Sequence, residues 1–97
     1  MILEETYLNE IKRILHKYIP NERVLAFGSR VHQRNLKPFS DIDLAIITTQ
    51  PLDNKLYMQL KETFEESNLP FRIDLVDWSL INDSFRNIIL KHHEQIQ

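Results

Sequence analysis

The sequence predicts an α/β or α+β fold in which helices pack on a small β-sheet. Segments with the three- and four-residue spacing of amphipathic helices alternate along the chain with short apolar runs typical of strands. The length of 97 residues predicts a single domain, residues 1–97, and 42% hydrophobic with 27% charged residues is a globular composition. The expected order is helix, strand, loop or short helix, strand, helix, strand, helix.

The first half of the chain predicts one helix and two strands. The apolar residues of the helix recur at helical spacing: Leu3, Tyr7, Leu8, Ile11, Leu15 and Tyr18. Pro20 and Asn21 end it. Residues 24–27 form a short apolar run that stops at Gly28, which is typical of a buried strand. Residues 41–47 begin by alternating and become continuously apolar, so we expect a second strand that is half-exposed at its start.

The second half predicts a helix, a strand and a final helix. Asp53 is the expected N-cap of a helix that ends near Asn68 and Pro70. Its apolar stripe contains Leu56, Leu60 and Phe64, with Tyr57 beside it. Residues 71–76 alternate like a strand, with Ile73 and Leu75 on one face and Arg72 and Asp74 on the other. The last helix begins near Asn82 or Asp83, and we expect it to turn inward Phe85, Ile88, Ile89 and Ile96.

Composition and charge exclude several classes of protein. The chain has no cysteine, which excludes disulfides and cysteine-based zinc sites and permits a reducing compartment. It has no apolar run long enough for a membrane span, and its acidic, periodic N-terminus does not resemble a signal peptide. A net charge of −2 argues against a basic nucleic-acid-binding surface. We therefore expect a cytoplasmic protein that binds neither membranes nor nucleic acid directly.

The only glycine of the chain stands at the end of the first predicted strand, followed by a serine. Gly28 lacks a Cβ, so the backbone there can approach a ligand closely or adopt a positive φ. The Ser29 hydroxyl and free backbone N–H groups after it would form a small anion site if a helical turn follows. Most Gly-Ser pairs are merely turns, so this feature needs support from the rest of the site.

Three aspartates are expected to meet on the sheet. Asp41 and Asp43 open the second strand and point to the same face, and Asp74 lies within the third strand. Carboxylates ~5 Å apart repel by ~3 kcal/mol per pair at an effective dielectric constant of ~20. A retained proton or a hard divalent cation such as Mg²⁺ would relieve that repulsion. The alternatives are that the pair is a turn or capping device and that Asp74 is paired with Arg72 or another cation.

The order of these motifs resembles a known family. Gly28-Ser29, then Ser40-Asp41-Ile42-Asp43-Leu44, then Asp74 within a strand is similar to the signature of the polymerase-β-type nucleotidyltransferases. Within that superfamily the chain most resembles the minimal nucleotidyltransferases, short antitoxins encoded beside HEPN-domain toxins. The resemblance runs from the strand before Gly28 to the final helix, and it implies a small mixed sheet backed by helices.

The resemblance also implies a mechanism and a partner. Asp41 and Asp43 would hold two Mg²⁺ ions, and Asp74 would bind one of them and help to deprotonate the attacking hydroxyl. The triphosphate of ATP would be bound by Gly28 and Ser29, and Arg30 would contact a phosphate. AMP would pass to a hydroxyl of a HEPN toxin, and pyrophosphate would leave. Because larger relatives add a helical domain, we expect the partner protein to complete the site in a hetero-oligomer.

Two other functions remain open from the sequence. Relatives usually carry a second glycine shortly after Gly-Ser, where this chain has Gln33, and a chain that has lost turnover would neutralise its toxin by binding alone. A nucleotidyltransferase acting on a small antibiotic-like molecule is the other alternative.

The remaining polar candidates are expected to lie outside the site. His32, Arg34 and Lys37 are interpreted as a solvated loop, and His92-His93-Glu94 as a surface cluster on the last helix. Asp77 has the opposite strand parity to Asp74, so it should face away from the three aspartates.

Overall fold

The computed structural model describes residues 3–28 and 41–97, and every element named below belongs to these two stretches. In chain order the elements are α1 (Glu5–Tyr18), β1 (Arg23–Phe27), β2 (Ile42–Ile47), α3 (Asn54–Glu65), β3 (Ile73–Asp77), the short 3₁₀ helix η1 (Trp78–Leu80), α4 (Asp83–Lys91) and β4 (His93–Gln95). The helices and strands predicted within these stretches are therefore present near their expected positions, and η1 and β4 are additional. The expected loop or short helix between the first two strands falls outside the described residues.

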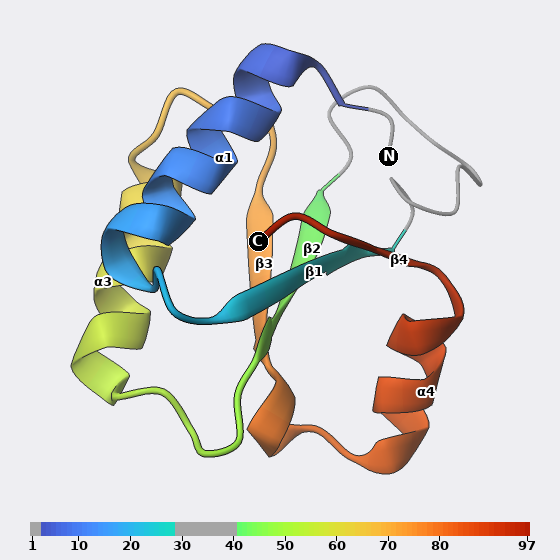
Figure 1. The fold of residues 1–97 in the computed structure, drawn as a ribbon. Coiled ribbons are helices and arrows are strands. Elements are labelled where there is room, and N and C mark those ends of the chain that lie inside the picture. Colours follow the sequence, from blue (N-terminus) through green and yellow to red (C-terminus); the bar gives the residue numbers. More distant parts are fainter. Residues whose placement is uncertain (1–2, 29–40) are drawn as a thin grey trace.

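The four strands form one mixed sheet in the order β3-β2-β1-β4 (Figure 1). β1 runs antiparallel to β2 and to β4, whereas β2 and β3 are parallel. Parallel neighbours need a crossover connection, and α3 supplies it because it links the end of β2 to the start of β3. The expected mixed sheet backed by helices is confirmed.

One face of the sheet is covered by α1 and α3, which lie side by side (Figure 1). The side chains buried there come from both helices and from alternate strand positions: Ile11, Ile14, Leu15, Val24, Ala26, Ile42, Leu44, Ile46, Leu60, Phe64 and Ile73. The predicted N-cap of α3 is confirmed, since the Asp53 carboxylate accepts a hydrogen bond from the Leu56 N–H at 3.1 Å. This face forms the larger part of the core.

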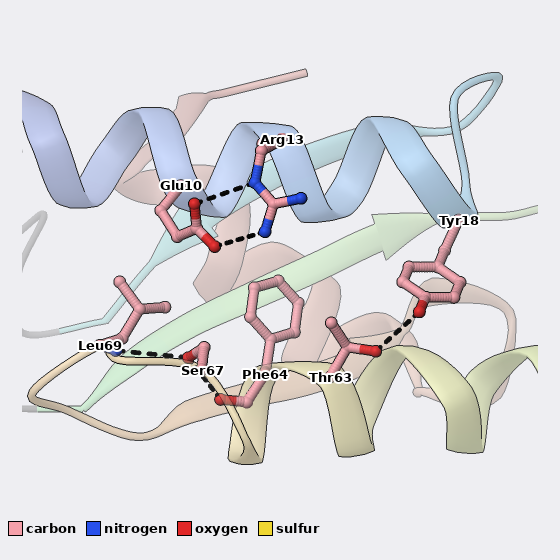
Figure 2. A network of polar contacts seen from close by, with 7 residues as sticks. All are labelled: Glu10, Arg13, Tyr18, Thr63, Phe64, Ser67 and Leu69. Atoms are coloured by element: carbon pink, nitrogen blue, oxygen red, sulfur yellow. Dashed lines mark hydrogen bonds and ion pairs between the residues drawn. The ribbon is translucent and has the colours of Figure 1, made fainter.

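Polar contacts border the α1–α3 layer on its exposed side (Figure 2). The Thr63 hydroxyl of α3 donates to the Tyr18 Oη of α1 at 2.9 Å. Arg13 and Glu10, both on α1, form an ion pair with a shortest N···O distance of 2.6 Å. Exposed pairs of this kind contribute little to stability, and the apolar contacts beneath them hold the two helices together.

The opposite face of the sheet carries a smaller core that packs against α4. Leu25, Phe27, Ala45 and Ile89 are buried in it. The rings of Phe27 and Phe85 meet edge to face with centroids 5.9 Å apart. This second cluster ends where β1 meets the start of β2, beside Asp43, which pairs with Phe27 in the register.

The expected course of the last helix was wrong in two respects. Ile88 is 58% exposed rather than turned inward, because it lies about 100° around the helix from the buried Ile89. The helix also ends at Lys91, and His93–Gln95 pairs with β1 as the edge strand β4. Ile96 is buried as expected, but it lies beyond α4 and joins the core on the α1–α3 side.

Asp77, the last residue of β3, is a buried carboxylate that links three segments. It accepts hydrogen bonds from the Thr48 hydroxyl, from the Leu52 N–H at 2.9 Å, and from the Ser79 N–H at 3.0 Å. Burial alone would raise the pKa of Asp77, but these hydrogen bonds outweigh it, and the pKa is lowered. Asp77 therefore ties the end of the parallel strand pair to η1.

We expect Asp77→Asn to destabilise the chain by about 2 kcal/mol at pH 7, because an amide places a donor against donors. Since the folded pKa of Asp77 is lowered, its stabilising effect should be present at neutral pH and lost only as the pH falls through that value. Urea unfolding of both proteins measures this difference. Asp83→Asn, at a carboxylate 94% exposed, is the matched control, and equal midpoints for the two variants would contradict the prediction.

Within residues 3–28 and 41–97, none of the helices has the length and apolar character needed to cross a membrane.

Candidate active site

Asp41, Asp43 and Asp74 come together on the sheet face that carries the second core cluster. Asp43 lies in β2 directly opposite Asp74 of β3 in the parallel register. Asp41 stands two residues before Asp43, just ahead of β2, and residues at this spacing in an extended chain point the same way. The predicted grouping of the three carboxylates on adjacent strands is confirmed, although the structure by itself assigns them no role.

Gly28 closes this site from the end of β1. Its φ of +88° is a conformation that residues with a Cβ rarely adopt, as expected for a glycine at this turn. A Cβ on Gly28 would lie 2.2 Å from Asp43 Oδ2, far inside van der Waals contact. The missing side chain therefore makes room for the carboxylate of Asp43, a neighbour that the sequence did not identify.

The electrostatic environment of Asp43 is unfavourable for its charged form. Partial burial, together with the negative charges of Asp74 and Asp41, raises the pKa of Asp43 from an ordinary 3.8 to about 6. The positive charge of Arg72 acts in the opposite direction. A carboxylate that is destabilised in this way gains most from a nearby cation.

Arg72 already supplies one positive charge to the site. Its Nη2 lies 3.1 Å from Asp41 Oδ2, and its Nε lies 3.3 Å from Asp74 Oδ1. The open alternative that Asp74 pairs with Arg72 is thus correct, and the same guanidinium also contacts Asp41. The arginine side chain is 70% exposed, so both ion pairs lie at the surface of the site.

The three carboxylates are the natural candidates for a metal site. In the conformation of residues 3–28 and 41–97 seen here, no group of three Asp, Glu, His or Cys side chains is placed so that all three could bind the same ion. The donor set nevertheless fits a hard divalent cation, because it consists of oxygen ligands only. The pKa of Asp43 is raised mainly by burial and further by the two neighbouring carboxylates, and a bound cation would favour its charged form.

A groove of about 510 Å³ adjoins the site. It is lined by the residue before β2, the end of α3 and the segment that leads into β3: Asp41, Phe64, Glu65, Leu69, Pro70, Phe71, Arg72 and Ile73. Asp41 and Arg72 belong to both the groove and the carboxylate cluster. The groove therefore offers space beside the ion pairs.

The other sequence candidates fall in different places. Asp77 lies three positions along β3 from Asp74 and points to the opposite face, as its parity predicted. His93 and Glu94 are exposed, as expected of a surface cluster, but they lie in β4 rather than on a helix. Arg72, which the sequence offered only as a partner for Asp74, is the site residue whose importance was underestimated.

Two of the predicted nucleotide-binding residues, Ser29 and Arg30, lie outside the described residues. The same applies to the loop positions His32, Gln33, Arg34 and Lys37 and to Ser40 of the second motif.

The chain is similar to known proteins in both sequence and fold. Residues 9–97 match the family described as “Polymerase beta, Nucleotidyltransferase”. A Haemophilus influenzae protein named “Probable protein adenylyltransferase MntA” is 48% identical over 87 residues, which cover 90% of this chain and 75% of that protein.

Solved structures of toxin–antitoxin proteins share the fold. A toxin–antitoxin structure with AMP-PNP is 27% identical with a TM-score of 0.74, over 93% of this chain and 72% of that one. A complex of a tri-AMPylated Shewanella oneidensis HEPN toxin with MNT antitoxin is 24% identical with a TM-score of 0.72, over 98% and 72% of the chains, which shows a likeness of fold alone. The family match spans nearly the whole chain. This chain therefore belongs to the polymerase beta nucleotidyltransferase family.

Proposed function

We propose that this chain is a Mg²⁺-dependent protein adenylyltransferase that transfers AMP from ATP to a hydroxyl of a HEPN-type toxin and so acts as its antitoxin. The observation that carries the proposal is the position of Asp43, which lies opposite Asp74 on β3 and directly against Gly28 at the end of β1. In the proposal, this corner of the sheet provides both the metal ligands and the glycine turn that the phosphates approach.

The carboxylates supply the metal ligands in this proposal. Asp41 and Asp43 hold two Mg²⁺ ions, and Asp74 is a ligand of one of them. When bound, the two ions stabilise the attacking and leaving oxygens of an in-line displacement at the α-phosphorus of ATP. The raised pKa of Asp43, about 6, still leaves this residue mostly ionised and able to bind a cation at pH 7–8.

The remaining residues position the two substrates. The Gly28 backbone, the Ser29 hydroxyl and the Arg30 guanidinium bind the triphosphate, and Asp74 accepts the proton of the attacking hydroxyl. The new bond joins the hydroxyl oxygen to the α-phosphorus, while the bond to pyrophosphate breaks. Positioning and charge neutralisation account for the rate in this type of reaction.

The relatives support the choice of nucleotide and partner. The Haemophilus protein, 48% identical, is named as a protein adenylyltransferase, and the structure with AMP-PNP is of a toxin–antitoxin. On this basis we propose a cytoplasmic hetero-oligomer in which the toxin both provides the acceptor hydroxyl and completes the site.

Incubation with ATP labelled at the α-phosphorus, Mg²⁺ and the protein encoded beside this chain tests the proposal. We expect label on that protein, and none when the same label is placed on the γ-phosphorus, because pyrophosphate leaves. EDTA should abolish the transfer.

Tight binding of the two proteins without any transfer of label would reject the enzyme and favour an antitoxin that acts by contact. Label on a small hydroxylated acceptor, with none on the protein, would favour the antibiotic-type alternative.

A further inference from the structure

The guanidinium of Arg72 occupies oxygens that the proposed metal ions require. It contacts Asp41 at 3.1 Å and Asp74 at 3.3 Å, and so bridges the residue preceding β2 to a residue of β3. In that arrangement no three acidic or histidine side chains of the described residues are placed to share an ion. A metal ion and Arg72 are both cations, so each weakens the binding of the other to the same carboxylates.

We propose that Arg72 is an internal counter-ion of the metal-free chain, which must release Asp41 and Asp74 when divalent ions bind. This inference rests on the proposed metal-dependent function and adds a positioning residue that sets the metal affinity of that site. Arg72 stabilises the carboxylate cluster without metal, and its release accompanies the formation of the metal site.

The surroundings of Arg72 allow this release. Its side chain is 70% exposed, and the two carboxylates that it contacts are 45% and 42% exposed. Ion pairs at such exposure are weak and are broken at little cost. The adjoining groove, lined by Phe71 and Glu65 among others, offers the released side chain space and a carboxylate on α3.

The chain offers a matched control for the change in total charge. Arg13 is 60% exposed and forms an ion pair with Glu10 on α1, and none of the three aspartates lies among its contacts. Arg13→Gln therefore removes one positive charge, as Arg72→Gln does, without touching the carboxylate cluster.

Binding of Mn²⁺, followed by the loss of its free-ion electron paramagnetic resonance signal, tests the inference without nucleotide or partner. Wild type, R72Q, R72K and R13Q are titrated at pH 8 and constant ionic strength. We expect R72Q to bind Mn²⁺ about threefold to tenfold more tightly than R13Q, the change that corresponds to losing two exposed ion pairs. R72K should fall between wild type and R72Q, because an ammonium cannot contact two carboxylates with a planar fork.

Three other results of the Mn²⁺ titration would contradict the proposal. If wild type binds Mn²⁺ and R72Q matches R13Q, Arg72 is not a counter-ion, while the proposed function stands. If R72Q binds Mn²⁺ more weakly than R13Q, Arg72 supports the metal site rather than competing for it. If no variant binds Mn²⁺ at millimolar concentration, the chain without nucleotide has no cation site for which Arg72 competes, and the counter-ion role is wrong. The metal-dependent function is then decided by the label-transfer assay with and without EDTA.

Discussion

Asp43→Asn is expected to lower AMP transfer by ~10³-fold or more while leaving the chain folded. Asp43 is the central carboxylate, opposite Asp74 in the register and against Gly28. A metal ligand contributes several kcal/mol to the stabilisation of charge in the transition state, and an amide lacks the charge that binds Mg²⁺. Label transfer to the partner protein measures the loss, and Asp83→Asn serves as the control at an exposed carboxylate.

The same substitution should stabilise the metal-free chain at neutral pH. The folded pKa of Asp43 is about 6, above its ordinary 3.8, so the folded chain holds this proton more tightly than the unfolded chain does. The stability gained from that proton is complete below pH 3.8 and is lost as the pH rises through about 6. The amide introduced by Asp43→Asn stays neutral across this range, so the variant has no such stability to lose.

In EDTA at pH 8 we therefore expect the free energy of unfolding of Asp43→Asn to exceed that of wild type by about 1–2 kcal/mol, after allowance for partial exposure of the site. The difference should vanish near pH 4. Urea unfolding at the two pH values measures it. If Asp43→Asn were less stable than wild type at pH 8, the charged form of Asp43 would not be unfavourable in the folded chain. If the variant transferred AMP at the wild-type rate, Asp43 would not be a metal ligand.

Gly28→Ala is expected to damage both folding and activity. The new Cβ would lie 2.2 Å from Asp43 Oδ2, and alanine would have to adopt a φ of +88°. A non-glycine residue in such a conformation costs about 1–3 kcal/mol, and the carboxylate would also have to move. We expect a loss of stability in that range and a loss of transfer comparable to that of Asp43→Asn.

A double-mutant cycle separates the two causes. In an Asp43→Ala background the carboxylate is gone, so Gly28→Ala should cost only the backbone strain. Urea unfolding of the four proteins yields the coupling between the two positions. A coupling energy of zero would mean that the carboxylate does not fill the space beside Gly28.

Local sequence patterns were sufficient for most of the helices and strands. The apolar spacing that predicted α1 and α3, and the Asp53 cap, are properties of neighbouring residues, and both helices formed where expected. β4 could not be predicted in this way. His93–Gln95 is an exposed, polar segment that becomes a strand only through its pairing with β1.

The candidate site also has features that local sequence predicts and features that depend on strand pairing. Strand parity placed Asp41 and Asp43 on one face and separated Asp74 from Asp77, because side chains alternate along any strand. Parity does not identify the neighbour of a strand. The register that sets Asp43 opposite Asp74 required the parallel pairing of β2 and β3.

The sequence by itself determined that three aspartates follow a single glycine, in an order that resembles the signature of the nucleotidyltransferases. Only the tertiary structure showed that Gly28 makes room for Asp43, and that Arg72 pairs with both Asp41 and Asp74. Gly28 and Asp43, and likewise Asp41 and Arg72, lie far apart in the chain, so the distances between them depend on how the three strands are paired. Local propensity carries no information about such distances, whereas the packed sheet fixes them.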